Sequence, residues 1–152
     1  MKKVKALALA LALTMGTTSF VTGCGNSSTK TVSIASQSEY QYISAADVLK
    51  VKDAHILDVR EEDKYKAGTV EGAEWKPIFP LEDTSLEEGM KEYAATLNDG
   101  KNIYIICNSG KRGAEKTTKI LVENGIDKSK IFTVEGGAKA LSEIDGALKP
   151  VQ

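Results

Sequence analysis

One segment of the sequence combines a nucleophile with positive charge. Cys107 begins the run Cys-Asn-Ser-Gly-Lys-Arg-Gly at residues 107–113, which directly follows an apolar, β-branched run at residues 103–106. A buried strand, then a Gly-bearing turn, then a helix places backbone N–H groups and cations around the residue that opens the turn. These surroundings favour the thiolate, the nucleophilic form of cysteine, near neutral pH. The segment therefore predicts a reactive thiol at Cys107.

The N-terminus has the pattern of a targeting segment. Three Lys lie within the first five residues and precede an apolar run at residues 6–13. This is the order found in secretory signals, and the run is shorter than the ~20 apolar residues that a membrane-spanning helix needs. The sequence Val-Thr-Gly-Cys at residues 21–24 resembles the bacterial lipobox. We therefore expect a signal peptide at residues 1–23 and lipidation of Cys24.

Lipidation would attach the chain to a bilayer on the extracytoplasmic face of a bacterial cell membrane, inner or outer. The alternative is ordinary secretion with Cys24 left as a free thiol. Residues 25–38 are rich in Ser, Thr, Asn and Gln. With Cys24 they predict a flexible tether at residues 24–38, and the folded domain is expected at residues 39–152.

The composition is that of one globular domain without a basic surface. The 152 residues are 41% hydrophobic and 27% charged, with a formal net charge of −1, so nucleic acid is not expected as a partner. Removal of residues 1–23 takes away three Lys and lowers the basic count from 20 to 17 against 21 acidic residues, giving about −4. A cationic turn in a mildly acidic chain predicts a local anion site.

Cysteine and histidine counts limit the other chemistry. With Cys24 acylated, Cys107 is the one thiol left, so no intramolecular disulfide is expected. The single histidine is His55. With one His and one usable Cys, we predict no metal-ligand cluster, and no cofactor is expected.

The rest of the pattern alternates short apolar runs with helical segments. Strands are predicted at residues 40–43, 55–59, 74–76, 103–106 and 130–134. Helices are predicted at residues 45–50, 61–66, 85–97, 113–123 and 138–144, the first capped by Ser44 and the third by a capping box beginning at Ser85. This alternation predicts an α/β fold, a small parallel sheet of about five strands with helices on both faces. Cys107 would lie at the carboxyl end of a strand, where such sheets form their sites.

Three separated segments resemble a single-domain rhodanese, which is a sulfurtransferase fold. They are the Leu-Asp-Val-Arg run at residues 57–60, the loop at residues 107–112 with the helix after it, and the Val-Glu-Gly-Gly run at residues 134–137. The resemblance as a whole covers about residues 40–146. The chain therefore resembles a single-domain rhodanese, and its N-terminus resembles that of a bacterial lipoprotein.

This resemblance implies sulfur transfer through a covalent intermediate. Cys107 would attack thiosulfate or a persulfide donor and carry the sulfur as a persulfide until cyanide or a thiol removes it. Arg112 would be the second catalytic residue, attracting the anionic donor. Asp58 and Arg60 would hold the loops at the sheet edge by an ion pair. The residues expected to bind substrate are Asn108, Ser109, Gly110, Lys111 and Gly113.

Loop length separates related chemistries. Arg112 is the fifth residue after Cys107, whereas in the related phosphatases and arsenate reductases the Arg is the sixth. The shorter loop suits a sulfur atom rather than phosphate or arsenate. The family often has Arg directly after the Cys and Ser after the loop, where this chain has Asn108 and Gly113. These departures leave the substrate preference open.

Other functions fit the same residues. The chain could be a non-enzymatic persulfide carrier or a thiol redox sensor that acts on a partner protein. In the first case the partner protein would accept the sulfur. It could also be a module that only binds an anion in the loop. The simplest interpretation of Cys107 is an inert buried cysteine, because free Cys is among the most buried residue types. The adjacent Gly and cations favour the reactive interpretation.

Overall fold

The computed structural model describes residues 40–151. The expected signal peptide, the lipidation site Cys24 and the whole tether lie outside the described residues, so these assignments stay predictions. None of the helices within residues 40–151 is long and apolar enough to cross a membrane.

The described residues form the α/β architecture that the sequence predicts. The strands are β1 (Gln41–Ile43), β2 (His55–Asp58), β3 (Glu74–Trp75), β4 (Ile103–Ile106) and β5 (Ile131–Val134). The α-helices are α1 (Ala45–Val48), α2 (Glu62–Ala67), α3 (Thr84–Ala94), α4 (Arg112–Glu123) and α5 (Gly137–Ser142), and short 3-10 helices are η1 (Ala95–Leu97) and η2 (Lys128–Lys130). All strand pairs are parallel, in the order β1-β5-β4-β2-β3.

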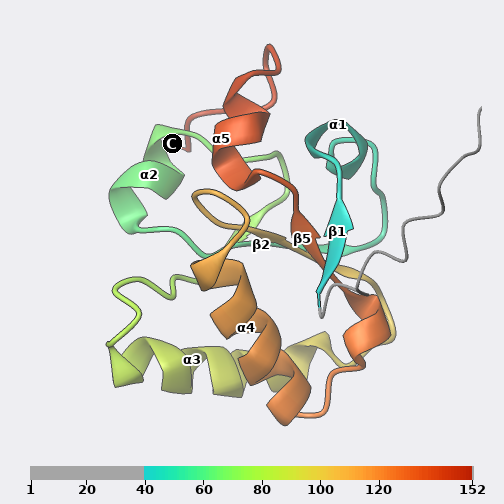
Figure 1. Cartoon of the computed structure of the whole chain (residues 1–152), viewed down its shortest axis with the longest axis vertical. Helices are drawn as coiled ribbons and strands as arrows, with labels where there is room; N and C mark the ends of the chain where they lie inside the picture. The colour runs from blue at the N-terminus through green and yellow to red at the C-terminus, as the bar shows by residue number, and fades with distance from the viewer. Residues whose placement is uncertain (1–39, 152) are drawn as a thin grey trace, which may run out of the picture. The chain divides into compact units, whose positions relative to one another are not determined.

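Helices cover both faces of this sheet (Figure 1). On one face α3 and α4 lie side by side, and on the other lie α1 and α5. β4 occupies the centre of the sheet, and all of its residues are buried. A strand with helices on both faces must be apolar on both, which explains the continuous Ile-Tyr-Ile-Ile run.

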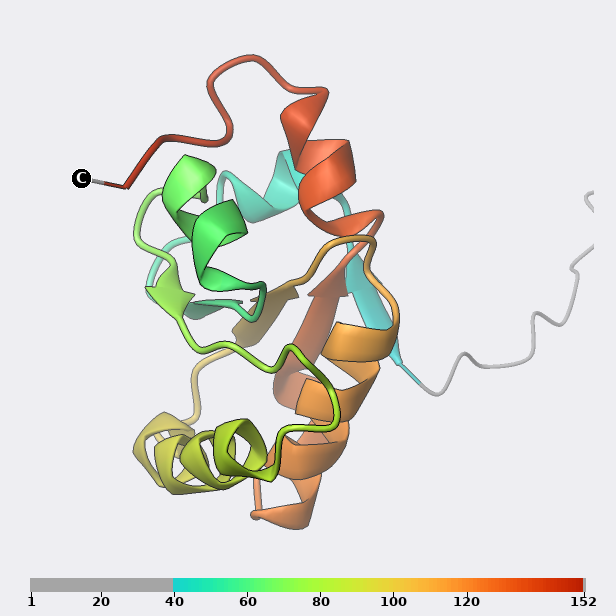
Figure 2. The ribbon, with the colours of Figure 1, turned by 90° about the vertical axis from the view of Figure 1, so that its left-hand side faces the viewer.

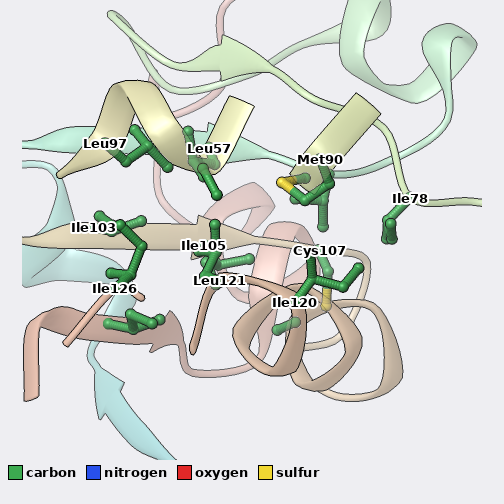
Figure 3. Close-up of a cluster of buried hydrophobic side chains, with 14 residues drawn as sticks. Leu57, Ile78, Met90, Leu97, Ile103, Ile105, Cys107, Ile120, Leu121 and Ile126 are labelled. Atoms are coloured by element: carbon green, nitrogen blue, oxygen red, sulfur yellow. The ribbon is translucent and has the colours of Figure 1, made fainter. Parts of the chain in front are cut away.

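Alternate residues of β4 serve the two cores. Ile103 and Ile105 belong to the cluster under α3 and α4, whereas Tyr104 and Ile106 belong to the cluster under α1 and α5. The period of two continues past the end of the strand. Cys107 therefore joins the first cluster, together with residues such as Ile78, Met90 and Ile120 (Figure 3).

Several helix boundaries differ from those predicted. Ser44 caps α1 as expected, its hydroxyl accepting a hydrogen bond from the Asp47 N–H at 3.1 Å. For α3 the predicted cap Ser85 was wrong. Asp83 is the cap, because its carboxylate accepts the Ser85 N–H at 2.9 Å and α3 begins at Thr84. The remaining boundaries are unchanged or shift by one or two residues, and η1 forms the last turn of the third predicted helix.

Candidate active site

Cys107 lies at the carboxyl edge of the sheet, directly after β4. The loop at residues 107–111 leads from β4 into α4, which begins at Arg112. Within this loop the Gly110 N–H donates a hydrogen bond to Cys107 Sγ at 3.1 Å. The expectation of a backbone donor aimed at the sulfur is thus met.

Two glycines allow the turn after β5 to pack tightly against this loop. Gly110 has φ +69°, and a Cβ there would lie 2.7 Å from the Val134 carbonyl oxygen. Gly137 has φ +59°, and a Cβ there would lie 2.7 Å from the Gly110 nitrogen and would also collide with the Cys107 carbonyl oxygen. Neither position has room for a side chain. The close packing of the late motif against the Cys107 loop therefore depends on glycine at both positions.

Backbone hydrogen bonds fix the loop to α5. The Ala138 N–H donates to the Cys107 carbonyl at 2.8 Å, and the Lys139 N–H donates to the Asn108 carbonyl at 3.2 Å. Two consecutive loop carbonyls are thus satisfied by two consecutive N–H groups of the first turn of α5. On the other side of the loop, the Gly110 N–H points to the sulfur.

A cavity of about 220 Å³ opens over the loop. Its lining consists of Phe79, Cys107, Asn108, Ser109, Lys111, Arg112 and Gly113. The structure therefore brings together the catalytic and substrate-binding residues expected from the sequence, with Gly110 donating to the sulfur from within the loop. Cys107 is only 2% exposed, and it lies in the lining of this cavity.

Phe79 forms a wall of the cavity that sequence reasoning did not find. A Cβ at Gly113 would lie 2.5 Å from the Phe79 ring, so the missing side chain of Gly113 makes room for the aromatic ring. Phe79 lies in the segment at residues 76–83, between β3 and α3. The signal that could have found it is the length of this connection, because long irregular connections often carry functional residues.

The two cations at the beginning of α4 are available to a ligand. Lys111 and Arg112 are exposed, and neither side chain has a hydrogen bond, ion pair or ring contact with any residue in the part of the chain described. Both line the cavity over Cys107. An anion entering that cavity would meet positive charge that is not already neutralised.

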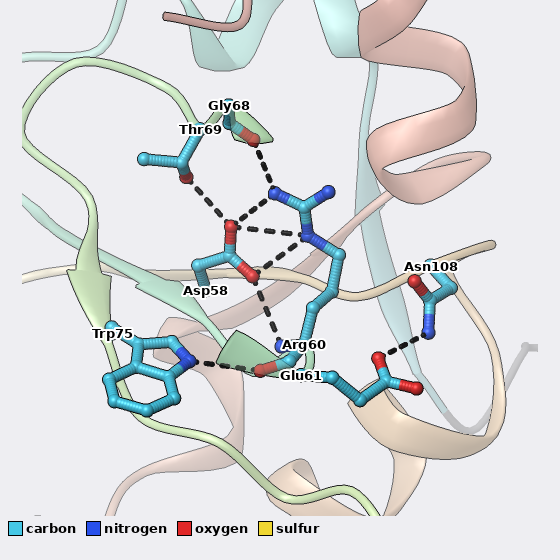
Figure 4. Close-up of polar contacts among 7 residues, drawn as sticks. All are labelled: Asp58, Arg60, Glu61, Gly68, Thr69, Trp75 and Asn108. Carbon is cyan, nitrogen blue, oxygen red and sulfur yellow. Dashed lines mark hydrogen bonds and ion pairs between the residues drawn. The ribbon is translucent and has the colours of Figure 1, made fainter. Parts of the chain in front are cut away.

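Glu61 connects the loop to the beginning of α2. The Asn108 side-chain amide donates to Glu61 Oε2 at 3.2 Å, and Lys64 Nζ lies 2.9 Å from Glu61 Oε1. Figure 4 shows the bond between Asn108 and Glu61. Partial burial opposes ionisation of Glu61, but hydrogen bonds from its own backbone, Lys64 and Asn108 outweigh burial and lower its pKa. Asn108, at the position where the family often has Arg, thus interacts with a carboxylate.

The ion pair predicted between Asp58 and Arg60 is present and buried. Arg60 donates from Nη2 to Asp58 Oδ2 at 2.6 Å and from Nε to Oδ1 at 2.9 Å (Figure 4). Two further bonds join the pair to the chain around it: the Gly68 carbonyl accepts from Arg60 Nη2, and the Thr69 hydroxyl donates to Asp58 Oδ2. Trp75 Nε1 donates to the Arg60 carbonyl at 3.0 Å. These bonds fix the chain immediately before Glu61.

The single histidine lies at the amino ends of the strands, whereas Cys107 lies at the carboxyl ends. His55 is the first residue of β2 and pairs with Ile103, the first residue of β4. Its Nε2 lies 3.0 Å from Asp99 Oδ2. Within residues 40–151 no group of three or more His, Cys, Asp and Glu side chains is arranged to hold a metal ion.

Comparison with known families matches residues 43–143 to the rhodanese-like domain. This match covers well over half of the chain. The chain belongs to the rhodanese-like domain family. The family includes sulfurtransferases and related functions, and many of its domains are not catalytic. A search of curated proteins finds no match to the chain.

Solved structures agree with this assignment. A rhodanese-related protein from Thermoplasma volcanium is 26% identical, with a TM-score of 0.57 over 74% of this chain and 100% of its own. A rhodanese-like domain protein from Staphylococcus aureus is 25% identical, with a TM-score of 0.54 over 74% and 99%. An As-Sb reductase from Leishmania major is 19% identical, with a TM-score of 0.57 over 72% and 84%. That likeness is one of fold.

Proposed function

We propose that this rhodanese-like domain is a sulfurtransferase that carries sulfur as a persulfide on Cys107. The observation that supports it most is the surroundings of the sulfur. Cys107 Sγ accepts an N–H hydrogen bond from its own loop at 3.1 Å and borders a cavity shared with two unpaired cations, Lys111 and Arg112. This arrangement suits a thiolate that receives a small anionic donor.

The first half-reaction loads the enzyme. The Cys107 thiolate attacks the outer sulfur of thiosulfate, a new S–S bond forms, and the bond between the two thiosulfate sulfurs breaks. Sulfite leaves with the electron pair of the broken bond, and Cys107 holds a persulfide anion. Arg112 and Lys111 attract the dianionic donor and stabilise the charge on the departing sulfite. A persulfide donor would react in the same way, with a thiolate as leaving group.

The second half-reaction unloads it. Cyanide or a thiolate attacks the terminal sulfur, the Cys107 S–S bond breaks, and the thiolate of Cys107 is regenerated. The products are thiocyanate or a new persulfide. The Gly110 N–H, which bonds to Sγ in the free domain, stabilises the returning charge. Neither half-reaction needs a general base once the thiol is ionised.

Loop length favours this reaction over oxyanion reduction or phosphate hydrolysis. Arg112 begins α4 as the fifth residue after Cys107. A loop one residue shorter than Cys-x5-Arg leaves fewer N–H groups to surround a tetrahedral oxyanion. Because the likeness to the As-Sb reductase is one of fold, function must be argued from the loop itself.

We also propose that the domain works outside the cytoplasm on a lipid anchor. The support is the N-terminal sequence, in which a signal-like segment ends at Cys24 in a run that resembles the lipobox. Acylation of Cys24 would hold the domain close to a membrane while Cys107 stays available as the reactive thiol.

Steady-state kinetics test the proposal. Thiosulfate and cyanide should give thiocyanate with ping-pong kinetics, the pattern of a covalent intermediate. Cys107→Ser should abolish turnover while the far-ultraviolet circular dichroism spectrum stays unchanged. Loading without turnover would favour the persulfide carrier instead. Hydrolysis of an aryl phosphate, or reduction of arsenate, without any thiocyanate would contradict the proposal.

A further inference from the structure

A second cavity adjoins the one over Cys107. It has a volume of about 310 Å³ and is lined by Glu61, Phe79, Pro80, Leu81, Glu82 and Arg112. Phe79 and Arg112 also line the Cys107 cavity, so the two cavities meet at these side chains. The adjoining space is therefore the natural place for the part of a substrate that lies beyond its reacting sulfur.

The wall of the second cavity comes mainly from the segment at residues 76–83. Figure 2 shows this segment running past the beginning of α4 on its way to α3. The Phe79 ring lies against Gly113, and Lys116 Nζ donates a hydrogen bond to the Leu81 carbonyl. Because both contacts are with α4, the segment is held beside the helix that carries Arg112.

Two opposite charges border this cavity without neutralising each other. Glu82 is exposed, and like Arg112 it has no hydrogen bond or ion pair with any other residue between 40 and 151. Glu61 differs, because its two oxygens already bond to Lys64 and Asn108. The apolar groups of Phe79, Pro80 and Leu81 complete the lining. A free carboxylate and a free guanidinium on one cavity match a ligand that carries both charges.

We propose that the second cavity is the acceptor subsite and that its ligand is a zwitterionic aminothiol, a small thiol with an ammonium and a carboxylate group. The ammonium group pairs with Glu82, the carboxylate pairs with Arg112, and the thiol faces Cys107. This inference rests on the proposed sulfurtransferase function. Arg112 is available to the acceptor because sulfite has left before the acceptor binds.

The transfer step balances without a further reactant. The aminothiol enters as its thiolate and attacks the terminal sulfur of the Cys107 persulfide. The new S–S bond forms on the aminothiol as the Cys107 S–S bond breaks, and its electron pair stays on Cys107 Sγ as the thiolate. The Cys107 persulfide anion takes up a proton from water before the acceptor attacks, and this proton stays on the transferred sulfur in the product, an aminothiol persulfide.

The same charges disfavour the donor in this subsite. Thiosulfate is a dianion, and Glu61 and Glu82 would repel it. Lys111 lines the Cys107 cavity but not the second one. The donor is therefore expected over the loop, between Lys111 and Arg112, and the acceptor beside residues 79–82. The sulfite group of the donor and the charged groups of the acceptor would then lie on different sides of Arg112.

Single-turnover discharge of the loaded enzyme tests this inference. The full chain, purified in detergent, is loaded with thiosulfate, freed of excess donor and checked by intact mass for one added sulfur. It is then mixed with cysteine, cysteamine, 3-mercaptopropionate or 2-mercaptoethanol. These carry both charges, the ammonium alone, the carboxylate alone and neither. Discharge rates are compared between the wild type, Glu82→Gln and the control Glu62→Gln.

Glu62 is a matched control because it neighbours Glu61, pairs with Lys66 at 2.6 Å and lines neither cavity. Comparing each thiol with itself in two proteins removes its intrinsic nucleophilicity. Glu82→Gln should lower the rates with cysteine and cysteamine about three- to fivefold relative to 2-mercaptoethanol, as expected for an exposed ion pair. The rate with 3-mercaptopropionate should not fall, and the control should match the wild type.

The outcomes separate this inference from the proposed function. If the wild type loads but Glu82→Gln slows all four thiols equally or none of them, the acceptor inference is overturned and sulfur transfer stands. If Glu62→Gln has the same selective effect, the effect comes from the general negative charge of this surface and not from a subsite at Glu82. That result also overturns the inference. A wild type that never gains sulfur would overturn the proposed function, and this inference with it.

Discussion

At the scale of single residues, Arg112 is the side chain on which both cavities depend. It begins α4, is exposed and lines both cavities. Because thiosulfate is a dianion, Arg112→Gln should remove a charge-assisted contact of about 1.5 kcal/mol, which corresponds to roughly a tenfold higher KM for thiosulfate. Steady-state kinetics measure the effect.

Lys119→Gln is the control for this prediction. Lys119 lies on the same helix, is exposed and lies 3.8 Å from Glu123, outside the lining of the Cys107 cavity. The substitution removes one positive charge from α4 but changes no residue of the site, so the KM for thiosulfate should change by less than about twofold. Equal effects of the two substitutions would mean that Arg112 acts only through the general potential of the helix.

The buried ion pair is a second property of single residues. Asp58 is 0% exposed and Arg60 is 5% exposed. Asp58→Asn would leave a buried guanidinium without its counter-charge, and we expect a loss of about 3–5 kcal/mol in the free energy of unfolding. Lys66→Gln breaks the exposed pair with Glu62 and should cost less than about 1 kcal/mol. Urea unfolding compares them, and similar values for both would refute the structural role of Asp58.

At the scale of elements, the approach of the turn after β5 to the Cys107 loop sets the shape of the site. Gly137→Ala should destabilise the fold, because a Cβ there collides with the loop backbone. Gly125→Ala is the control, since Gly125 also has positive φ, +91°, but a Cβ there meets nothing within 4 Å. We expect Gly137→Ala to cost about 1–3 kcal/mol more than Gly125→Ala, the range found for overpacking.

Thermal unfolding of the two variants gives this difference. Discharge kinetics add a functional readout, because displacement of the loop should slow the reactions of Cys107 in Gly137→Ala alone. If the two substitutions have equal costs, backbone conformation accounts for Gly137 and the close approach to the loop does not matter.

The elements also show what the sequence can and cannot predict. Each strand and α-helix was predicted because its signal is local, as in the β-branched run of β4 and the Ser44 cap of α1. The cap of α3 was wrong because Asp83 and Ser85 both suit the role and only the backbone geometry selects one. Phe79 packs against Gly113, and Asn108 donates a hydrogen bond to Glu61. Both are contacts between segments that are distant in the sequence. No local pattern encodes them.

At the scale of the whole molecule, the anchor at Cys24 is the proposal with the widest consequence. When the full chain is produced in a bacterium, the wild type should fractionate with membranes and partition into the detergent phase. Cys24→Ser should remain unprocessed or be released, because acyl chains are the proposed attachment. Cys107→Ser should keep the membrane fractionation of the wild type. Acyl chains absent from the wild type by intact mass, or still present on Cys24→Ser, would contradict lipidation of Cys24.

The central claim is that Cys107 forms a persulfide. Intact mass of the full chain after incubation with thiosulfate tests it most directly, followed by the addition of cyanide. The account predicts a gain of about 32 Da, one sulfur atom, located on Cys107 and lost when cyanide is added, with no gain in Cys107→Ser. A wild-type chain that gains no sulfur from thiosulfate or from a polysulfide donor would contradict it and would leave the domain as an anion-binding module.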